Sequence, residues 1–218
     1  MSFRKEEKLN IHQSKLLELI AWIHKNNGYM LYEARIVSST YFDTYAFDMH
    51  IDSEEGSIPR KKIRIRSYFE GKHVQNISSL ETKISSAEGR YKTSTNNFDL
   101  KRTMSIGIFD PLYGVCTPKV RVSYNRSYYK IFNIRLTIDQ DIRYKKINSL
   151  GYEVVGARDP DIIIEIKAQD STSLEHLIRK FPFNRIRFSK YSRAINTLNL
   201  TLINRLYIIN FWGVDQLS

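Results

Sequence analysis

Apolar and polar residues alternate at period two in several segments of the chain, which predicts β-strands with two unlike faces. In the segment 60–69, Ile63 and Ile65 alternate with charged residues, and the segments 80–84 and 161–168 follow the same pattern. The charged positions of this alternation are Lys62, Arg64, Arg66, Glu81, Lys83, Glu165 and Lys167. One face of the predicted sheet therefore packs on a core, while the other is rich in Arg and Lys and calls for an anionic ligand.

The same alternation, together with turn residues between the segments, predicts strands near 4–8, 35–43, 60–69, 77–85, 90–95, 118–129, 133–143, 161–168 and 185–190. Apolar stripes at helical spacing predict helices over 11–26, 171–181 and 192–209. Many strands with few intervening helices favour an antiparallel barrel or a strongly curled sheet with flanking helices, an α+β fold. We find no linker or repeat and expect one domain over residues 1–218.

Composition adds a strong positive charge to this picture. Lys and Arg total 34 against 23 Asp and Glu, a net charge of +11, which favours nucleic acid, an anionic membrane surface or phosphate-rich molecules as partners. Because the basic residues follow strand alternation and form no exposed patch, we expect no nucleic acid. A lone cysteine, Cys116, no apolar run behind the charges of the N-terminus, and no run of 18 apolar residues lead us to expect a cytoplasmic protein without a transmembrane segment.

Eight short motifs, in order along the chain, resemble the VTC domain, the catalytic domain of the vacuolar transporter chaperone polyphosphate polymerases. They are RKEEK at 4–8, STYFDT at 39–44, KIRIRSY at 62–68, LETK at 80–83, YNR at 124–126, RLTID at 135–139, IIEIK at 163–167 and RFSKY at 187–191. Each motif is weak alone, but the ordered set spans most of the chain.

The resemblance implies a triphosphate tunnel metalloenzyme fold of eight antiparallel strands closed around a basic tunnel. It implies a polymerase that uses ATP and Mn²⁺ or Mg²⁺ and transfers the terminal phosphoryl group to a polyphosphate chain. Carried over by motif, the catalytic residues are Lys8, Arg64, Arg66, Lys83, Arg126, Arg135 and Lys190. Tyr124, Arg187 and Ser189 take substrate-binding positions, and Glu165 and Glu6 take metal-binding positions.

Other interpretations of these residues stay open at this point. The basic strand 62–66 could be a solvated face, Glu165 and Lys167 only an ion pair, and Tyr124 a core residue. Arg121 and Arg126 cannot share a face of a regular strand, which favours a structural role for Arg121. The same scaffold could hydrolyse triphosphates or only bind an anionic polymer, and the C-terminal helix could contact a partner or a membrane surface. The oligomeric state is left open.

Overall fold

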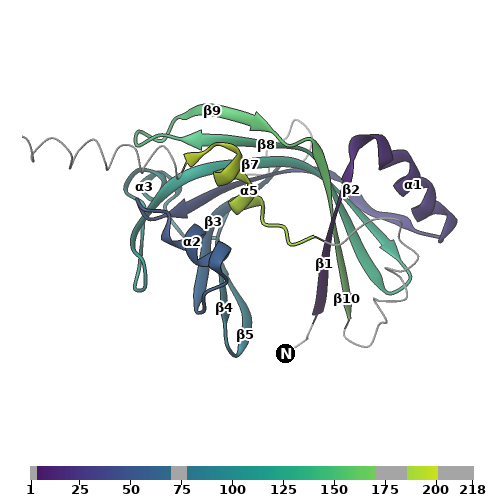
Figure 1. Cartoon of the computed structure of the whole chain (residues 1–218), viewed down its shortest axis with the longest axis horizontal. Coiled ribbons are helices and arrows are strands. Elements are labelled where there is room, and N and C mark those ends of the chain that lie inside the picture. Colours follow the sequence, from purple (N-terminus) through teal and green to yellow (C-terminus); the bar gives the residue numbers. More distant parts are fainter. Residues whose placement is uncertain (1–3, 70–77, 170–185, 201–218) are drawn as a thin grey trace, which may run out of the picture.

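The computed structural model describes residues 4–69, 78–169 and 186–200, and antiparallel strands dominate this part of the chain (Figure 1). Its helical elements are the 3₁₀ helix η1 (Gln13–Lys15), α1 (Leu16–Lys25), α2 (Asp48–Glu55), α3 (Leu100–Ile106) and α5 (Lys190–Thr197). Its strands are β1 (Arg4–His12), β2 (Tyr29–Asp43), β3 (Arg60–Phe69), β4 (Ser78–Ser86), β5 (Gly89–Thr95), β6 (Ile108–Asp110), β7 (Gly114–Ile131), β8 (Ile134–Ile147), β9 (Glu153–Arg158) and β10 (Asp161–Gln169).

The strands form one curved sheet in the order β1-β10-β8-β7-β2-β3-β4-β5, with β6 added to β7 and β9 added to β8. Every pair is antiparallel. The sheet bends into an arch whose ends are β1 and β5 (Figure 1). The predicted antiparallel, strand-rich architecture is confirmed, but within the described ranges the sheet has ten strands and stays open between β1 and β5 rather than closing as an eight-stranded barrel.

The curved sheet has a convex and a concave face (Figure 1), and successive side chains of each strand point to one face and then to the other. At one end of the convex face, α1 covers β1, β10, β8 and β7 (Figure 1). Leu19 and Ile23 of this helix pack in a buried cluster with Leu136, Ile138 and Ile164. The apolar side chains on the convex side of these strands thus hold α1 against the outside of the arch.

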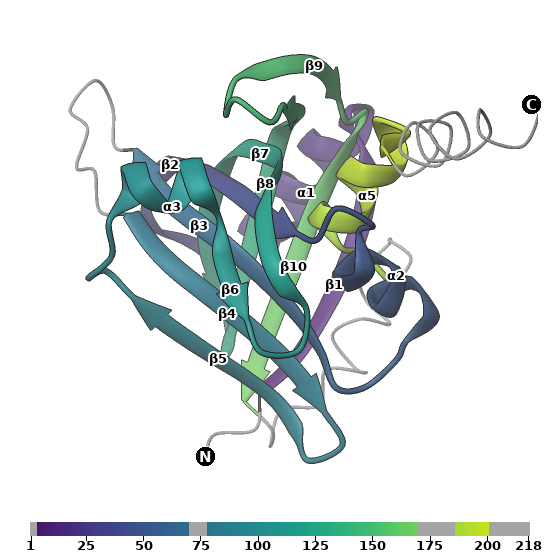
Figure 2. The same cartoon turned by 90° about the vertical axis from the view of Figure 1, so that its left-hand side faces the viewer.

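The other end of the convex face is covered by α3 and the short strand β6 (Figure 2). Phe42, Ile63 and Ile65 form the buried cluster here, and Met104 of α3 packs against it. The isoleucines that alternate with the basic residues of β3 therefore belong to a core outside the arch.

Inside the arch, α5 covers part of the concave face (Figure 1). Its Tyr191, Ala194 and Ile195 pack with Val120 and Val122 of β7 in a buried cluster. The concave face is therefore apolar under α5 and charged elsewhere, so α5 borders the basic surface and carries residues into it.

A bulge in β8 changes which residues face inward. Ser123 pairs with Arg143 but Asn125 pairs with Gln140, so two residues of β8, Asp141 and Ile142, lie opposite one residue of β7. Asp141 has a positive φ of 51°, which aspartate tolerates better than most residues. The extra residue lets charged positions before the bulge and apolar positions after it share the concave face.

Most predicted elements are present with shifted ends. The predicted helix 11–26 begins only at Leu16, because the N-terminal strand extends to His12. Residues 186–189 form no strand, although the amide of Ile186 donates to the carbonyl of Lys8 at 2.9 Å. The predicted helix 171–181 lies outside the described residues, and the predicted helix 192–209 is described only as α5. Pattern analysis missed α2, α3, β6 and β9.

Candidate functional site

Three arginines predicted to bind phosphate are buried on the concave face. Arg64 and Arg66 of β3 and Arg126 of β7 expose only 7%, 8% and 8% of their surface. A buried guanidinium is unfavourable unless hydrogen bonds and opposite charge compensate it. All three have hydrogen-bond partners, and Arg64 and Arg126 also face a carboxylate, so the basic strand is not a solvated face.

Arg64 and Arg66 are held by residues of the neighbouring strands. Arg64 donates from Nε to Glu81 of β4 at 2.8 Å and from Nη1 to the hydroxyl of Tyr41 at 3.2 Å. Arg66 donates from Nη2 to the hydroxyl of Tyr124 at 3.0 Å. These bonds hold the planar guanidinium groups of both arginines in place, and guanidinium groups in fixed positions are suited to binding phosphate oxygens.

The arginines change the acidity of the groups around them. Burial alone would raise the pKa of Tyr41, but Arg64 and Arg66 outweigh it and lower that pKa to about 7. Burial also opposes ionisation of Glu81, yet Arg64 foremost holds its pKa at about 2. Positive potential therefore dominates this part of the concave face.

Asp139 joins two further predicted site residues. Arg126 donates to its carboxylate from Nε at 2.6 Å and from Nη2 at 2.7 Å, and Lys190 of α5 pairs with the same carboxylate. The Lys190 ammonium also lies 4.6 Å from the ring centroid of Tyr124. Burial alone would raise the pKa of Asp139, which is 0% exposed, but Lys190 and Arg126 hold it below its usual value. This one carboxylate only partly offsets the two cations, on the face where an anionic ligand is expected.

Tyr124 combines two of the roles that the sequence left open. Its ring belongs to the buried cluster under α5, as a core residue would. Its hydroxyl accepts the hydrogen bond from Arg66, and burial raises its pKa to about 12. The residue therefore stays a neutral phenol between the apolar and the basic parts of the concave face.

The two carboxylates predicted to bind metal lie on adjacent strands and share one lysine. Lys167 Nζ is 2.8 Å from Glu165 Oε1 and 3.6 Å from Glu6 Oε2. Burial would raise the pKa of Glu165, but Lys167 and Arg126 keep it well below its usual value, so the carboxylate is ionised at neutral pH.

An all-oxygen pair of this kind fits Mg²⁺ or Mn²⁺, which take one or two carboxylates and complete their shell with water and phosphate oxygens. The described residues contain no cluster of three or more His, Cys, Asp or Glu that could hold a metal alone. A metal here would therefore depend on ligands brought by the substrate.

Lysines from both arms of the arch face the basic surface. Lys8 of β1 donates to the carbonyl of Phe188 at 3.0 Å, and Lys62 of β3 donates to the hydroxyl of Ser189 at 2.9 Å. Burial lowers the pKa of Lys62 to about 8, and the charge of Lys8 contributes to this. The side chain of Lys83 of β4 is exposed, yet its pKa is also lowered to about 8, because the surrounding protein removes water from the ammonium and the charge of Arg64 repels it. The arch thus brings distant strands within electrostatic reach.

Two predicted site residues lie away from this centre. Arg135 is exposed and lines a small pocket with Lys130 and Lys167 at the far end of the concave face. Arg187 donates to the backbone carbonyl of Ser53 in α2 at 2.6 Å. The structure brings together the remaining predicted residues: Lys8, Arg64, Arg66, Lys83, Tyr124, Arg126, Glu165, Ser189, Lys190 and, at its edge, Glu6.

Four residues that were assigned no site role from the sequence belong to this centre: Tyr41, Lys62, Glu81 and Asp139. Strand alternation had already placed Lys62 and Glu81 on the charged face, and the same parity places Asp139 there, four positions after Arg135. Arg121 lies on the convex face, where it donates to Thr40 at 3.2 Å and to Glu153 at 2.6 Å. This agrees with its odd separation from Arg126.

Comparison with solved structures finds similar folds at low sequence identity. A protein described as a "putative adenylate cyclase" from Vibrio parahaemolyticus has a TM-score of 0.52 and 14% identity over 89% of this chain and 98% of that one. A conserved hypothetical protein from Pyrococcus furiosus has a TM-score of 0.45 and 17% identity over 82% of this chain and 85% of that one. The first of these likenesses supports the fold only.

None of the described helices is long and apolar enough to cross a membrane.

The other comparisons concern sequence. A search of curated proteins finds no match. The model of the VTC domain matches residues 3–108 and 112–199, which together include the charged centre of the concave face. The predicted resemblance is confirmed, and the chain belongs to the VTC domain family.

Proposed function

We propose that this protein is a metal-dependent polyphosphate polymerase, which transfers the terminal phosphoryl group of ATP to a growing polyphosphate chain. The observation that carries the proposal is the buried cationic centre of the concave face, in which Arg64, Arg66, Arg126 and Lys190 converge from two strands and a helix. Family membership supports a triphosphate substrate. The polymerase activity is the finer step proposed here.

The chemistry of the transfer matches the residues present. A terminal oxygen of the polyphosphate chain attacks the γ-phosphorus of ATP, the bond from that phosphorus to the β-phosphate oxygen breaks, and ADP leaves. The attacking oxygen is already ionised at neutral pH, so no general base is needed, and catalysis rests on positioning and charge stabilisation. The arginine forks align the phosphates, and Lys8, Lys62 and Lys83 surround them with further positive charge.

Glu165 and Glu6 would hold the divalent ion, which would neutralise phosphate oxygens and so make the γ-phosphorus easier to attack. Lys167, which lies between these carboxylates, would then yield its place to the ion. The carboxylate of Asp139 would keep Arg126 and Lys190 aligned until phosphate arrives.

The decisive experiment is incubation of the full chain with ATP and Mn²⁺, followed by gel separation of the products. Long polyphosphate chains with release of ADP are expected. Orthophosphate as the sole product would replace the proposal with a triphosphatase, and tight polyphosphate binding without ADP release would replace it with a binding module.

The variant Glu165→Gln tests the metal-binding role. We expect activity to fall about a hundredfold or more, because the ionised oxygen that suits a hard cation is lost, while nucleotide affinity without metal is retained. Glu153→Gln is the matched control, since Glu153 pairs with Arg121 and Lys145 away from the concave face. Normal activity of Glu165→Gln in saturating Mn²⁺ would remove Glu165 from metal binding.

A further inference from the structure

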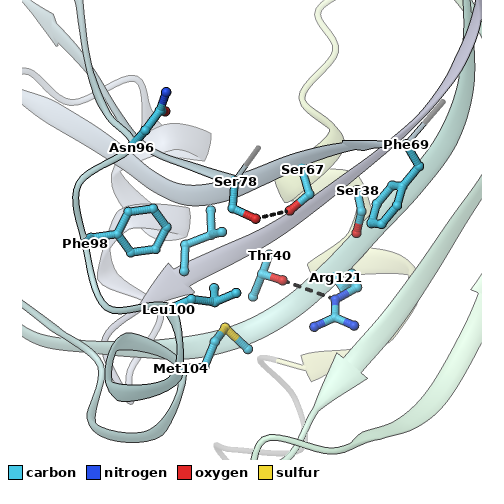
Figure 3. Close-up of a pocket in the computed structure, with 11 residues that line it drawn as sticks. Ser38, Thr40, Ser67, Phe69, Ser78, Asn96, Phe98, Leu100, Met104 and Arg121 are labelled. Atoms are coloured by element: carbon cyan, nitrogen blue, oxygen red, sulfur yellow. Dashed lines mark hydrogen bonds between the residues drawn. The ribbon is translucent and has the colours of Figure 1, made fainter. Parts of the chain in front are cut away.

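A pocket of about 440 Å³ lies on the convex face, on the opposite side of β2 and β3 from the basic centre (Figure 3). The outer residues of β2, β3 and β4 form its floor, and the segment 96–104, which enters α3, forms its far wall. None of the residues to which we give a role in phosphoryl transfer lines it. The pocket is therefore separate from the proposed active site.

The pocket exists because residues with small hydroxyl side chains occupy positions of the strands that face the convex side. Ser38, Thr40 and Ser67 occupy outward positions, whereas the next outward residues of the same strands, Phe42 and Ile65, fill the core under α3. Side chains this small cannot reach α3, so space remains beside a packed apolar cluster. The sequence thus leaves a gap with a polar floor and an apolar wall.

The polar groups of the floor are partly satisfied. The hydroxyls of Ser67 and Ser78 bond to each other at 2.8 Å, and Thr40 accepts from Nε of Arg121 at 3.2 Å (Figure 3). Ser38 has no side-chain partner among the described residues. Arg121 uses Nη1 to bond Glu153 at 2.6 Å, while its Nη2 makes no hydrogen bond to the part of the chain described. Donors therefore remain available at this end of the pocket.

The two ends of the pocket differ in chemistry. Arg121 and Ser38 lie at one end with Phe69, whereas Phe98, Leu100 and Met104 lie toward the other end, on the side of Asn96 (Figure 3). Both Phe98 and Met104 also pack against the buried cluster of β2 and β3. A ligand that fills the pocket would need a polar head and an apolar body, as ligand pockets with few polar groups generally require.

The charge around Arg121 limits the charge of that head. Arg121 and Lys145 both pair with Glu153, the latter at 3.2 Å, so this cluster carries one net positive charge. One positive charge balances a single carboxylate. A triphosphate would leave most of its charge uncompensated here, in contrast to the concave face.

We propose that this pocket is a second ligand site, which binds a small amphipathic carboxylate with its head at Arg121 and Ser38 and its hydrocarbon body against Phe98, Leu100 and Met104. The proposal does not depend on the polymerase activity, because the site uses other residues of other elements and the opposite face of β2 and β3.

The test is calorimetric titration of the full chain with 4-phenylbutyrate and with its neutral amide. We expect saturable binding of the carboxylate and affinity about tenfold or more weaker for the amide and for Arg121→Gln, since the charged hydrogen bond is lost in both. Arg143→Gln is the matched control, because Arg143 is exposed and pairs with Asp141 outside the pocket. Its affinity should equal that of the unaltered protein, and tripolyphosphate should not displace the probe.

The proposal would be overturned by the absence of saturable binding at millimolar probe, by equal affinity for the carboxylate and the amide, or by displacement of the probe by tripolyphosphate. If Arg121→Gln does not fold, Ser38→Leu provides the second variant, because it fills the floor of the pocket without altering the ion pairs. Binding should be abolished in Ser38→Leu, and full affinity in that variant would also overturn the proposal.

Discussion

Asp139 is the residue on which the charge balance of the concave face depends most directly. It is fully buried and pairs with both Arg126 and Lys190, so its one negative charge offsets half of their charge. A phosphate ligand of the kind proposed would compete with this carboxylate for the same donors. The residue would therefore stabilise the free protein and weaken ligand binding at once.

The variant Asp139→Asn separates these two effects. Lys190 and Arg126 lose the carboxylate that they share, and Arg126 keeps only the longer contact to Glu165 at 3.4 Å, so we expect the free energy of unfolding to fall by about 3 kcal/mol without ligand. Tripolyphosphate should raise the stability of this variant more than that of the unaltered protein, because no carboxylate competes with it. Urea unfolding with and without tripolyphosphate measures both quantities.

Asp110→Asn is the matched control for that experiment. Asp110 is also buried and accepts two bonds from Lys61, at 3.0 and 2.8 Å, but Lys61 alternates with the inward residues of β3 and lies outside the concave face. This variant should lose stability without gaining any extra stabilisation from tripolyphosphate. Equal gains in both variants would show that Asp139 does not compete with the ligand.

The lowered pKa values of Lys62 and Lys83 predict that affinity for phosphate ligands falls at alkaline pH. The pKa of each lies near 8, below the ordinary value for lysine. As the pH rises through about 8 the free protein loses these charges and affinity for tripolyphosphate falls. A bound polyanion favours the charged lysines, so binding near pH 8.5 should take up protons. Calorimetry in buffers of different ionisation enthalpy measures this uptake, and proton release would contradict the prediction.

Among the elements, α2 and α5 depend on one residue of β2. Asp43 accepts from the amides of Thr44 at 2.8 Å, Met49 at 3.0 Å and His50 at 3.0 Å, and from the hydroxyl of Tyr191 in α5. The strand therefore fixes the start of α2 and holds α5 inside the arch. Since Ser189 caps α5 and Lys190 begins it, this contact also positions part of the site.

The variant Asp43→Asn should reveal this dependence. Its amide group brings donors toward a site that offers only donors, so we expect a loss of about 3 kcal/mol in the free energy of unfolding. Asp99→Asn is the control, because Asp99 is the exposed N-cap of α3 and asparagine caps equally well. Chemical denaturation compares the two, and similar small losses in both would show that Asp43 is only an ordinary cap.

At the scale of the whole molecule, stability should decrease from the centre of the arch toward β5. β7 and β8 are flanked by strands on both sides and carry many buried residues, whereas β5 is an edge strand whose residues are mostly exposed. Local opening therefore costs least at β5. We expect its amides to exchange with deuterium about a hundredfold or more faster than those of β7, measured by mass spectrometry. Equal protection would mean that this edge is covered in solution.

The sequence predicts the faces of the strands better than their pairing. Alternation at Ile63 and Ile65 correctly separated core from charged positions in β3, because parity is a local property. Closure of the sheet is set by long-range contacts, so the opening between β1 and β5 had no local signal. The polar helix α2 was missed because it carries no apolar stripe, and only three of its residues are buried. The motifs located most of the basic centre, and two of them contain Glu81 and Asp139. They did not identify these two residues as buried counter-ions, since burial depends on strand pairing.

The bulge in β8 has a consequence for how this chain can change in length. Asp141 is the extra residue that lets Asp139 before it and Tyr144 after it both face inward. Its deletion would turn one half of β8 over, exposing Ile142 and Tyr144 or moving Asp139 away from Arg126. Substitutions at Asp141 alter exposed ion pairs with Arg143 and Arg158, and its positive φ favours aspartate, asparagine or glycine. This position should therefore accept Asn or Gly but no deletion, so the bulge constrains the length of the strand as well as the residue type.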